Sequence, residues 1–306
     1  MLDNFRHPYG VKPIGNSLLA TDEERATRGN GFGSLRILTD ETILEILGFL
    51  DAFDLSSMSM TSKACYVYSM TYDLWRDLCL RFVNKSIQFQ STWRDTYVSE
   101  YLKRKHQSDS ADLAKKYIHT PICATGVFSD YLHRLWTSHA FDLTTHCPHF
   151  LDYDNVDRLP VSDDLTDRFV REYEGKNVPV VIKQGAADWP AMTKWDEAYL
   201  EATCGERSFR ATSATAPEAC SFTLAQYFRY AAQTREEVPL YLFERDFVRL
   251  APALARDYAP PGPFDPARRP DTDLFRVLGA GRRPDYQCKP TSCTRLLSTI
   301  AVSIIV

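Results

Sequence analysis

The sequence predicts an α+β protein, in which a helical amino-terminal part precedes a region of mixed strands and helices. Three observations lead to this fold class. Apolar residues recur at helical spacing between positions 43 and 50. Residues 178–182 form a short β-branched run between an asparagine and a glycine, which is typical of a buried strand. Residues 240–243, Leu-Tyr-Leu-Phe, form a second short apolar run that predicts a strand.

The composition is that of a globular protein. The chain has 306 residues, of which 44% are hydrophobic and 25% are charged, so it is long enough for two domains of ordinary size. Its net charge of −4 comes from 36 basic and 40 acidic residues, and it creates no overall attraction to nucleic acid. We therefore expect no nucleic-acid partner.

The cysteines and the apolar runs indicate the cellular compartment in which the protein is expected. Eight cysteines are scattered without a C-x-x-C pair, which favours free thiols in a reducing compartment over a zinc ribbon or a disulfide framework. The first ten residues carry no apolar core of a secretory signal. No run of about 18 apolar residues occurs, so we expect no membrane partner. These features predict a soluble protein of the nucleus, the cytoplasm or both.

Changes in composition and pattern along the sequence divide it into five segments. They are a polar leader at 1–34, a helical region at 35–102, a helical linker at 103–151, a region of mixed elements at 152–286 and a Ser-, Thr- and Cys-rich tail at 287–306. The linker begins with a basic, polar patch that is typical of a helix end.

The helical region opens with a clear start signal. Thr39 can cap a helix, and Asp40 and Glu41 suit the positive end of its dipole. Two more short helices are expected before Trp75. Three short helices make only a small core, and such a core is commonly completed by a partner.

The order of residues in this region resembles an F-box. The positions that follow the F-box pattern are Leu38, Glu41, Ile43, Leu44, Ile46, Leu47, Phe49, Leu50, Asp54, Leu55, Lys63, Tyr66, Leu74 and Trp75. Thr39 replaces the usual proline. The resemblance implies binding to a Skp-type adaptor and recruitment of a cullin ubiquitin ligase complex. It also implies that five apolar side chains contact the adaptor, namely Leu38, Ile43, Leu47, Leu50 and Leu55. The alternative is an ordinary helical subdomain that packs on its own protein.

The region at 152–286 resembles a second family. The segments that carry this resemblance include 177–182, 188–192, 238–243 and 281–286. In this order they resemble the amino-terminal part of jumonji-C proteins of the phosphatidylserine-receptor-like branch, and the whole chain resembles fungal F-box/jumonji-C proteins. The resemblance implies an incomplete cupin-type jelly roll. In the full-length family it implies Fe(II) and 2-oxoglutarate as cofactors.

The expected metal ligands of that family are missing. Jumonji oxygenases hold Fe(II) with two histidines and a carboxylate, and the first two ligands follow the stretch that resembles 282–286. No histidine occurs after His149. The sequence therefore predicts no catalytic residue, no metal ligand and no cofactor for this polypeptide as written, and no turnover of 2-oxoglutarate with added iron. Residues 287–306 do not resemble the family and are consistent with translation out of frame or through an intron.

Two histidines of the linker are candidates for a zinc site. His146 and His149 stand at i and i+3 and could share a helix face. Pro148 interrupts such a helix, and no matching ligand pair follows. Loop contacts are therefore the favoured role of these histidines.

Three hypotheses for the function remain. The main one is an F-box-type interaction protein that docks the adaptor and presents a surface to an unidentified protein client. The alternative is a fragment, or a misassembled gene product, of an Fe(II)/2-oxoglutarate-dependent protein hydroxylase or demethylase. The third is a fragment without function.

Overall fold

The chain forms two compact units in the computed structural model. Unit 1 contains Met1–Pro148 and Arg210–Tyr241, and unit 2 contains His149–Phe209 and Leu242–Val306. The structure describes residues 7–265 except 17, 19, 84–86, 106–121, 141–144, 146, 151, 154, 214–219, 243, 245–246 and 260. The predicted tail at 287–306 lies outside the described residues, as does the stretch 281–286.

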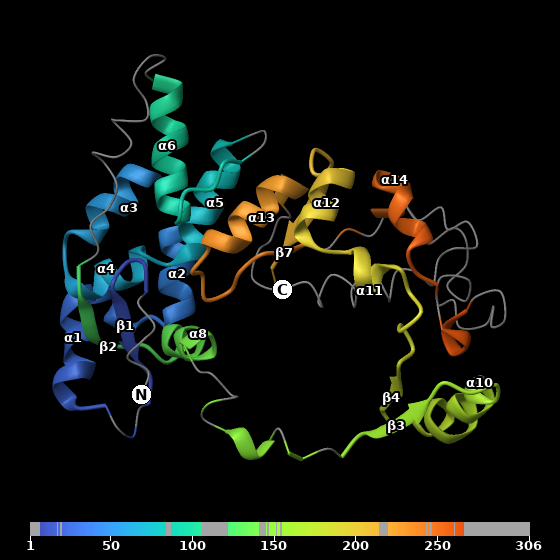
Figure 1. The fold of residues 1–306 in the computed structure, drawn as a ribbon. Helices are drawn as coiled ribbons and strands as arrows, with labels where there is room; N and C mark the ends of the chain where they lie inside the picture. The colour runs from blue at the N-terminus through green and yellow to red at the C-terminus, as the bar shows by residue number, and fades with distance from the viewer. Residues whose placement is uncertain are drawn as a thin grey trace, which may run out of the picture. The chain divides into compact units, whose positions relative to one another are not determined.

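Unit 1 is mainly helical (Figure 1). Its helices are α1 (Asp22–Phe32), the 3-10 helix η1 (Gly33–Ile37), α2 (Asp40–Gly48), α3 (Ala52–Ser59), α4 (Lys63–Ser69), α5 (Tyr72–Phe82), α6 (Trp93–Lys105), α8 (Asp130–Ala140) and α13 (Leu224–Gln233). The segment 210–241 thus groups with the amino-terminal helices, although it lies inside the region that the sequence assigned to 152–286.

Side-chain caps determine where the first predicted helices begin. As predicted, Thr39 caps α2, where its hydroxyl accepts a hydrogen bond from the backbone N–H of Thr42 at 3.3 Å. Asp51 caps α3 by accepting from the N–H groups of Phe53 and Asp54 at 2.8 and 2.9 Å. Because of this cap, α3 begins at Ala52.

The leader is more ordered than the sequence predicted. Residues 11–14 form strand β1 (Val11–Ile14), which pairs in parallel with β2 (Ala124–Phe128). Helix α1 follows and begins with a capping box. The N–H of Thr21 donates to Glu24 Oε2 at 2.7 Å, and the N–H of Glu24 donates to the Thr21 hydroxyl at 3.2 Å. The expectation of a loose leader is therefore wrong for this part of it.

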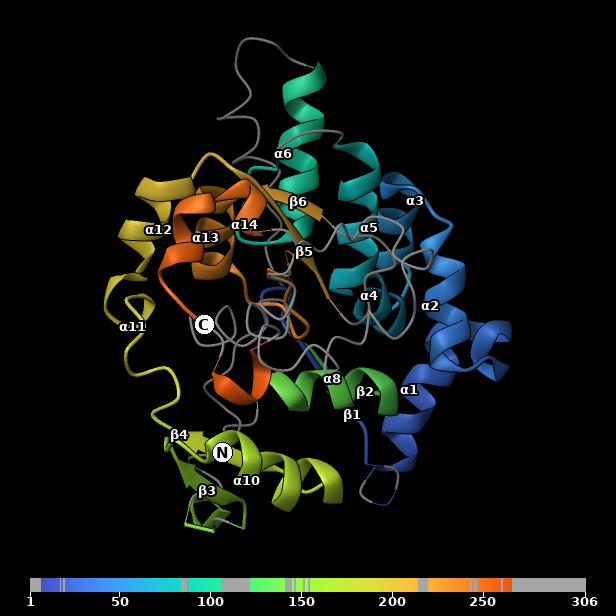
Figure 2. The same cartoon turned by 90° about the vertical axis from the view of Figure 1, so that its right-hand side faces the viewer.

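Large aromatic side chains fill the core of unit 1. Trp75, Trp93, Trp136 and Tyr230 are each at most 2% exposed. Burial of a large apolar side chain stabilises a fold by roughly 1.5–3 kcal/mol. Figures 1 and 2 both show α5 and α6 side by side, so that their aromatic residues share this core.

Unit 2 combines short strands with short helices. Its elements are β3 (Asp157–Pro160), α10 (Leu165–Arg168), the π-helix η3 (Phe169–Tyr173), the 3-10 helix η4 (Glu174–Lys176), β4 (Val180–Lys183), α11 (Ala191–Lys194), α12 (Glu197–Cys204), α14 (Phe247–Leu250) and the 3-10 helices η5 (Pro252–Arg256) and η6 (Gly262–Phe264). β3 and β4 pair in parallel beside α10 (Figure 2), with a small core of Leu159, Leu165 and Tyr173. The predicted strand at 178–182 is therefore present and begins two residues later.

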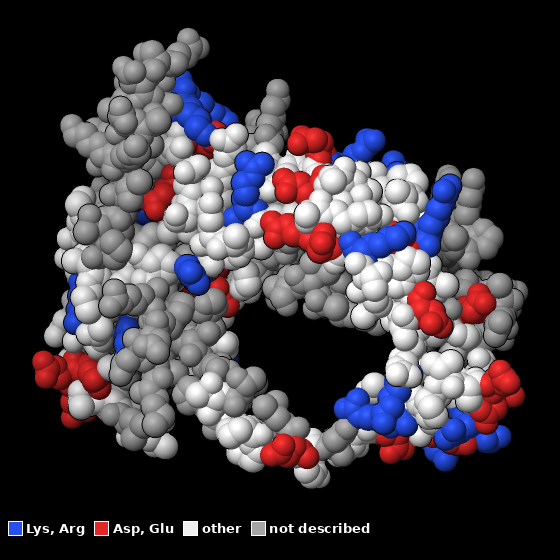
Figure 3. All heavy atoms as spheres, in the orientation of Figure 1, with Lys and Arg blue, Asp and Glu red and all other residues white. Residues whose placement is uncertain are grey.

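A third sheet has the strand order β6-β5-β7, formed by Cys220–Thr223, Ser208–Thr212 and Tyr241–Leu242. Together these elements confirm the predicted mixed α+β fold class. Within the described part of the chain, every helix is too short or too polar to cross a bilayer. On the face drawn in Figure 3, Lys and Arg are interspersed with Asp and Glu over the described residues. Charges mixed in this way give that face no strong field of one sign.

Candidate functional site

The five predicted adaptor contacts do not share one exposed face. Ile43 and Leu47 are each 2% exposed and Leu55 is 0% exposed, so all three belong to the core of unit 1. Leu38 and Leu50 are half-buried. This arrangement matches the alternative interpretation, a helical subdomain packed on its own protein, for three of the five side chains.

Other apolar side chains of the same helical region are exposed. Ile37, Phe49, Phe53 and Met60 are between 64% and 83% exposed. Sequence reasoning missed them because helical periodicity identifies an apolar stripe, and the stripe is the face that packs inward. The expected contact with a Skp-type adaptor stays a prediction.

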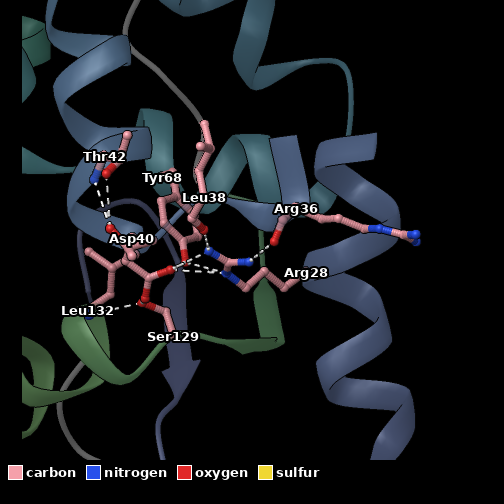
Figure 4. Close-up of polar contacts among 9 residues, drawn as sticks. Arg28, Arg36, Leu38, Asp40, Thr42, Tyr68, Ser129 and Leu132 are labelled. Atoms are coloured by element: carbon pink, nitrogen blue, oxygen red, sulfur yellow. Dashed lines mark hydrogen bonds and ion pairs between the residues drawn. The ribbon is translucent and has the colours of Figure 1, made fainter. Parts of the chain in front are cut away.

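A polar network joins four elements of unit 1 around Arg28 and Asp40 (Figure 4). From α1, the Arg28 guanidinium donates through Nη2 to Asp40 Oδ1 at 2.8 Å and through Nε to the same oxygen at 3.0 Å. The hydroxyl of Tyr68 in α4 donates to this oxygen at 2.6 Å. Ser129, just before α8, donates to Asp40 Oδ2 at 2.7 Å. Asp40 is thus a shared acceptor for side chains that lie up to 89 positions away from it in the sequence.

Burial makes this network important for stability. The side chains of Arg28 and Asp40 are 15% and 13% exposed. Desolvation raises the pKa of Tyr68, and its hydrogen bond to Asp40 raises it further, so the phenol stays protonated and donates. Figure 4 shows the side chains directed at one another within the helical unit, with Arg28 also donating to the carbonyls of Arg36 and Leu38. The network can hold these helices in fixed positions. Both carboxylate oxygens of Asp40 accept hydrogen bonds within it, so Asp40 has a structural role that does not require contact with solvent.

A second cluster is fully buried and holds segment 210–241 in unit 1. Glu236 is 1% exposed and accepts hydrogen bonds at Oε1 from Trp93 Nε1 at 2.6 Å and from the Tyr230 hydroxyl at 2.8 Å. Arg76, which is 0% exposed, places Nη1 3.9 Å from Glu236 Oε2. Its Nη2 lies 2.6 Å from Asp73 Oδ1. A buried guanidinium is therefore surrounded by carboxylates from α5 and from residue 236.

The carboxyl groups of this cluster are weak acids. Desolvation raises the pKa of Glu236 to about 7, although its hydrogen bonds from Tyr230 and Trp93 and the charge of Arg76 act in the opposite direction. Desolvation also raises the pKa of Glu237 to about 8, with additional repulsion from Asp73 and Glu236. His7 accepts the N–H of Tyr9 at Nδ1, so its Nε2 carries the proton that faces Glu237 Oε1 at 3.7 Å.

Strongly raised carboxyl pKa values are common in active sites, but they also occur in structural networks. Here the donors to Glu236 are core side chains, and the residue is sealed from solvent. The arrangement therefore fastens the segment that carries residue 236 onto α5 and α6. Sequence reasoning missed Arg76, Glu236 and Glu237, because no short motif marks partners that are 160 positions apart.

The described residues do not fit an iron centre. Among them, no group of three His, Cys, Asp or Glu side chains is close enough to hold a metal ion. His133 places Nδ1 3.1 Å from the carbonyl of Pro13, and Nε2 lies 3.2 Å from the Thr137 hydroxyl, so both ring nitrogens are engaged in unit 1. His149 is exposed. His106, His119 and His146 lie outside the described residues, so only one member of the candidate zinc pair, His149, is described.

Similarity to known proteins is strong over most of the chain. No protein-family model matches it. It is 33% identical over 279 residues to Arginine-specific demethylase JMJ22 of Arabidopsis thaliana, which covers 91% of this chain and 50% of that protein. It is 30% identical over 270 residues to Lysine-specific demethylase JMJ21 of the same plant, covering 88% of this chain and 26% of that protein.

A third relative is more distant. The Bifunctional arginine demethylase and lysyl-hydroxylase psr-1 of Caenorhabditis elegans is 23% identical over 154 residues, which is 50% of this chain and 36% of that protein. The chain thus spans about half the length of the first of these relatives and about a quarter of the second.

These relatives correct the main functional hypothesis. An alignment that covers 91% of the chain includes most of the helical unit, so those helices are shared with a protein described as a demethylase. The expectation that the chain acts mainly as an F-box adaptor is therefore wrong. The similarity supports the resemblance to jumonji-C proteins and favours the alternative hypothesis: this chain is similar, over both of its units, to demethylases of protein arginine and lysine side chains.

Proposed function

We propose that the chain forms the supporting amino-terminal part of a protein that removes methyl groups from methylated arginine side chains of other proteins by Fe(II)/2-oxoglutarate-dependent oxidation. The observation that carries this proposal is the 33% identity over 279 residues to an arginine-specific demethylase. The psr-1 relative is described as an arginine demethylase and a lysyl-hydroxylase, so its demethylation is described for arginine, which favours arginine over lysine as the demethylated residue. In the jumonji-C family that the sequence resembles, bound Fe(II) and 2-oxoglutarate supply the oxidising chemistry.

The described residues have a supporting part in this activity. They contain no group of side chains that fits iron, so no step of the oxidation is assigned to them. Their two networks, around Asp40 and around Glu236, hold the helices and the segment 210–241 in fixed positions. Such a rigid support is what a catalytic site on neighbouring elements requires.

The test compares two polypeptides. One is the 306-residue chain, and the other is the product of the same transcript read in frame beyond the codon for Tyr286, where an H-x-D or H-x-E pair is sought within about 25 codons. Each is incubated with Fe(II), 2-oxoglutarate and a dimethylarginine peptide. We expect the longer product to consume 2-oxoglutarate and to release formaldehyde, and the 306-residue chain to do neither.

Matched peptides separate the possible outcomes. An unmethylated peptide of the same sequence controls for uncoupled consumption of 2-oxoglutarate, and a trimethyllysine peptide tests the choice of side chain. Preference for the lysine peptide would contradict the arginine assignment. Inactivity of an iron-loaded longer product on both peptides would contradict demethylation, and turnover by the 306-residue chain would contradict the supporting role.

A further inference from the structure

Unit 1 contains a pocket of about 670 Å³ that has no part in the proposed oxidation. Its volume lies in the range of small-molecule sites, which is roughly 300–1,000 Å³. The walls come from the end of α3 with Ser56 and Met60, from α4 with Tyr66, from the start of α6 with Arg94, and from Ile122 just before β2. All of these elements belong to unit 1.

The charged residues that line the pocket are all basic. Eleven residues line the pocket, and they include Lys63 and Arg94 but no Asp or Glu. The ammonium of Lys63 lies beside Gly126 in β2. It is 4.0 Å from the position that a Cβ atom would occupy if residue 126 had a side chain. In the part of the chain that the structure describes, Lys63 makes no ion pair. Its charge is therefore not neutralised by the residues of unit 1 that the structure describes.

Arg94 is a second cation, and its ion pair with Asp95 is long. Its side chain is 15% exposed, and Asp95 Oδ1 lies 4.0 Å from Nη1, which is beyond hydrogen-bond distance. Nε and Nη1 are sealed from solvent and have no hydrogen-bond partner among the described residues. The guanidinium lies 5.3 Å from the centre of the Trp75 ring, which holds it in place.

The other polar groups of the lining are already engaged. The hydroxyls of Ser59, Ser62 and Tyr66 donate hydrogen bonds to backbone carbonyls within unit 1. The remaining surface includes the side chains of Met60, Met70 and Ile122. A ligand therefore meets two cations and an apolar wall. Buried guanidinium nitrogens without hydrogen bonds, such as Nε and Nη1 of Arg94, are unfavourable, and a bound anion that accepts from them would offset that cost.

We propose that this pocket binds a small organic anion, a phosphate monoester or a carboxylate with an apolar body, through Lys63 and Arg94. The two cations bind the anionic head, and the methionine-lined wall receives the apolar body. The pocket lies wholly within unit 1, so binding depends neither on iron nor on the oxidation. Its failure would leave the demethylase proposal untouched.

Isothermal titration calorimetry of the 306-residue chain tests the proposal with phenyl phosphate and phenylacetate as probes. Phenol and inorganic phosphate are the controls for the apolar body alone and for the anion alone. We expect one or both organic anions to bind, and Lys63→Gln and Arg94→Gln each to weaken that binding by about tenfold, the loss expected for one charge-assisted contact. Arg25→Gln, which removes an exposed cation outside the pocket, is expected to change nothing.

A residue-specific readout accompanies the titration. Cys123 lines the pocket and is exposed, whereas Cys147 is half-buried and does not line it. Bound phenyl phosphate is expected to slow the alkylation of Cys123 by iodoacetamide, a neutral reagent, while Cys147 serves as the internal control. Lys63→Gln should abolish this protection. Because Lys63 is an exposed residue, this variant tests the site even where Arg94→Gln reduces stability.

Three results would overturn the proposal. The first is the absence of binding by both organic anions to the folded chain. The second is equal affinity for phenyl phosphate and for either control, since it would show an apolar surface or an adventitious ion site. The third is unchanged affinity and unchanged Cys123 protection in Lys63→Gln.

Discussion

The indole of Trp93 donates a hydrogen bond of 2.6 Å to the carboxyl group of Glu236, a residue 143 positions further along the chain. The two side chains are 0% and 1% exposed. This bond joins the first residue of α6 to the loop after α13. It means that the helical unit is incomplete without the segment 210–241.

Removal of this bond is expected to loosen α13. Trp93→Phe keeps an aromatic ring but leaves Glu236 with one donor fewer, and it creates a small cavity. We expect a loss of about 2–4 kcal/mol in the free energy of opening α13, measured by hydrogen exchange at its amides. A double-mutant cycle with Glu236→Gln is the control. If the two single losses simply add, the bond contributes nothing to stability.

The stability of unit 1 should fall as the pH rises from about 5 to 8. The pKa of Glu236 is raised to about 7 and that of Glu237 to about 8, so the folded state binds more protons than the unfolded state in this interval. The stabilisation is complete below the unfolded pKa of 4.5 and is lost as the pH passes the folded values. Each titrating carboxyl contributes at most about 1.4 kcal/mol per pH unit.

Glu237→Gln separates the two carboxyl groups in this prediction. The groups that face Glu237 are His7, Asp73 and Glu236, and the amide cannot ionise next to them. We expect the variant to flatten the pH dependence and to be more stable than the parent at pH 8, as measured by urea unfolding between pH 5 and 8. A parent protein whose stability increases over this interval would contradict the assignment.

The network around Asp40 gives a prediction for the front of the chain. Asp40→Asn removes the charge that Arg28, Tyr68 and Ser129 share, and we expect unit 1 to lose about 1.5–3 kcal/mol of unfolding free energy in urea. Asp22→Asn is the matched control, because Asp22 pairs with Arg25 at a fully exposed position. Similar losses in both variants would show that the buried network contributes no more to stability than an exposed ion pair does.

Unit 2 depends on a different carboxylate. Asp257 is 3% exposed and accepts hydrogen bonds from Lys194 at 2.9 Å and from Trp195 and Tyr199 at 3.1 Å each. Burial raises its pKa, but these bonds lower it more, so its pKa lies below 3.8. Its stabilisation is therefore present above that value and is lost as the pH falls through the folded pKa.

Asp257→Asn is accordingly expected to destabilise unit 2 at pH 7 by about 1–3 kcal/mol, seen as faster hydrogen exchange in α12. Lys194→Met should cost less, because the lysine side chain is 51% exposed and solvent screens its charge. A larger effect of Lys194→Met than of Asp257→Asn would contradict this ranking.

Local chemistry explains which elements were predictable. Thr39 caps α2 as expected, and α13 begins with a similar local signal, a capping box of Thr223 and Gln226. Both signals lie within four residues of the helix start. The strands predicted at 178–182 and 240–243 are also present, because short β-branched or aromatic runs act locally in the same way.

Distant contacts explain what was missed. β1 pairs with β2 more than a hundred positions away, and no sequence signal near Val11 indicates that its partner is Ala124. The sequence predicts a short helix in this region but does not identify which side the core covers; in α3, Leu55 is 0% exposed and Phe53 is 64% exposed. The functional interpretation failed for a related reason, since a local helical pattern outweighed the similarity that extends over 91% of the chain.

The parallel pairing of β1 with β2 and the position of Glu236 have a consequence for synthesis on the ribosome. β1 emerges early, yet its partner strand follows more than a hundred residues later, and the carboxyl partner of Arg76 follows at residue 236. At about 5–20 residues per second, the interval between Val11 and Tyr241 lasts on the order of ten to fifty seconds. During that time a strand edge and a guanidinium destined for the interior stay exposed to solvent, so unit 1 can complete its core only after residue 241 has been synthesised.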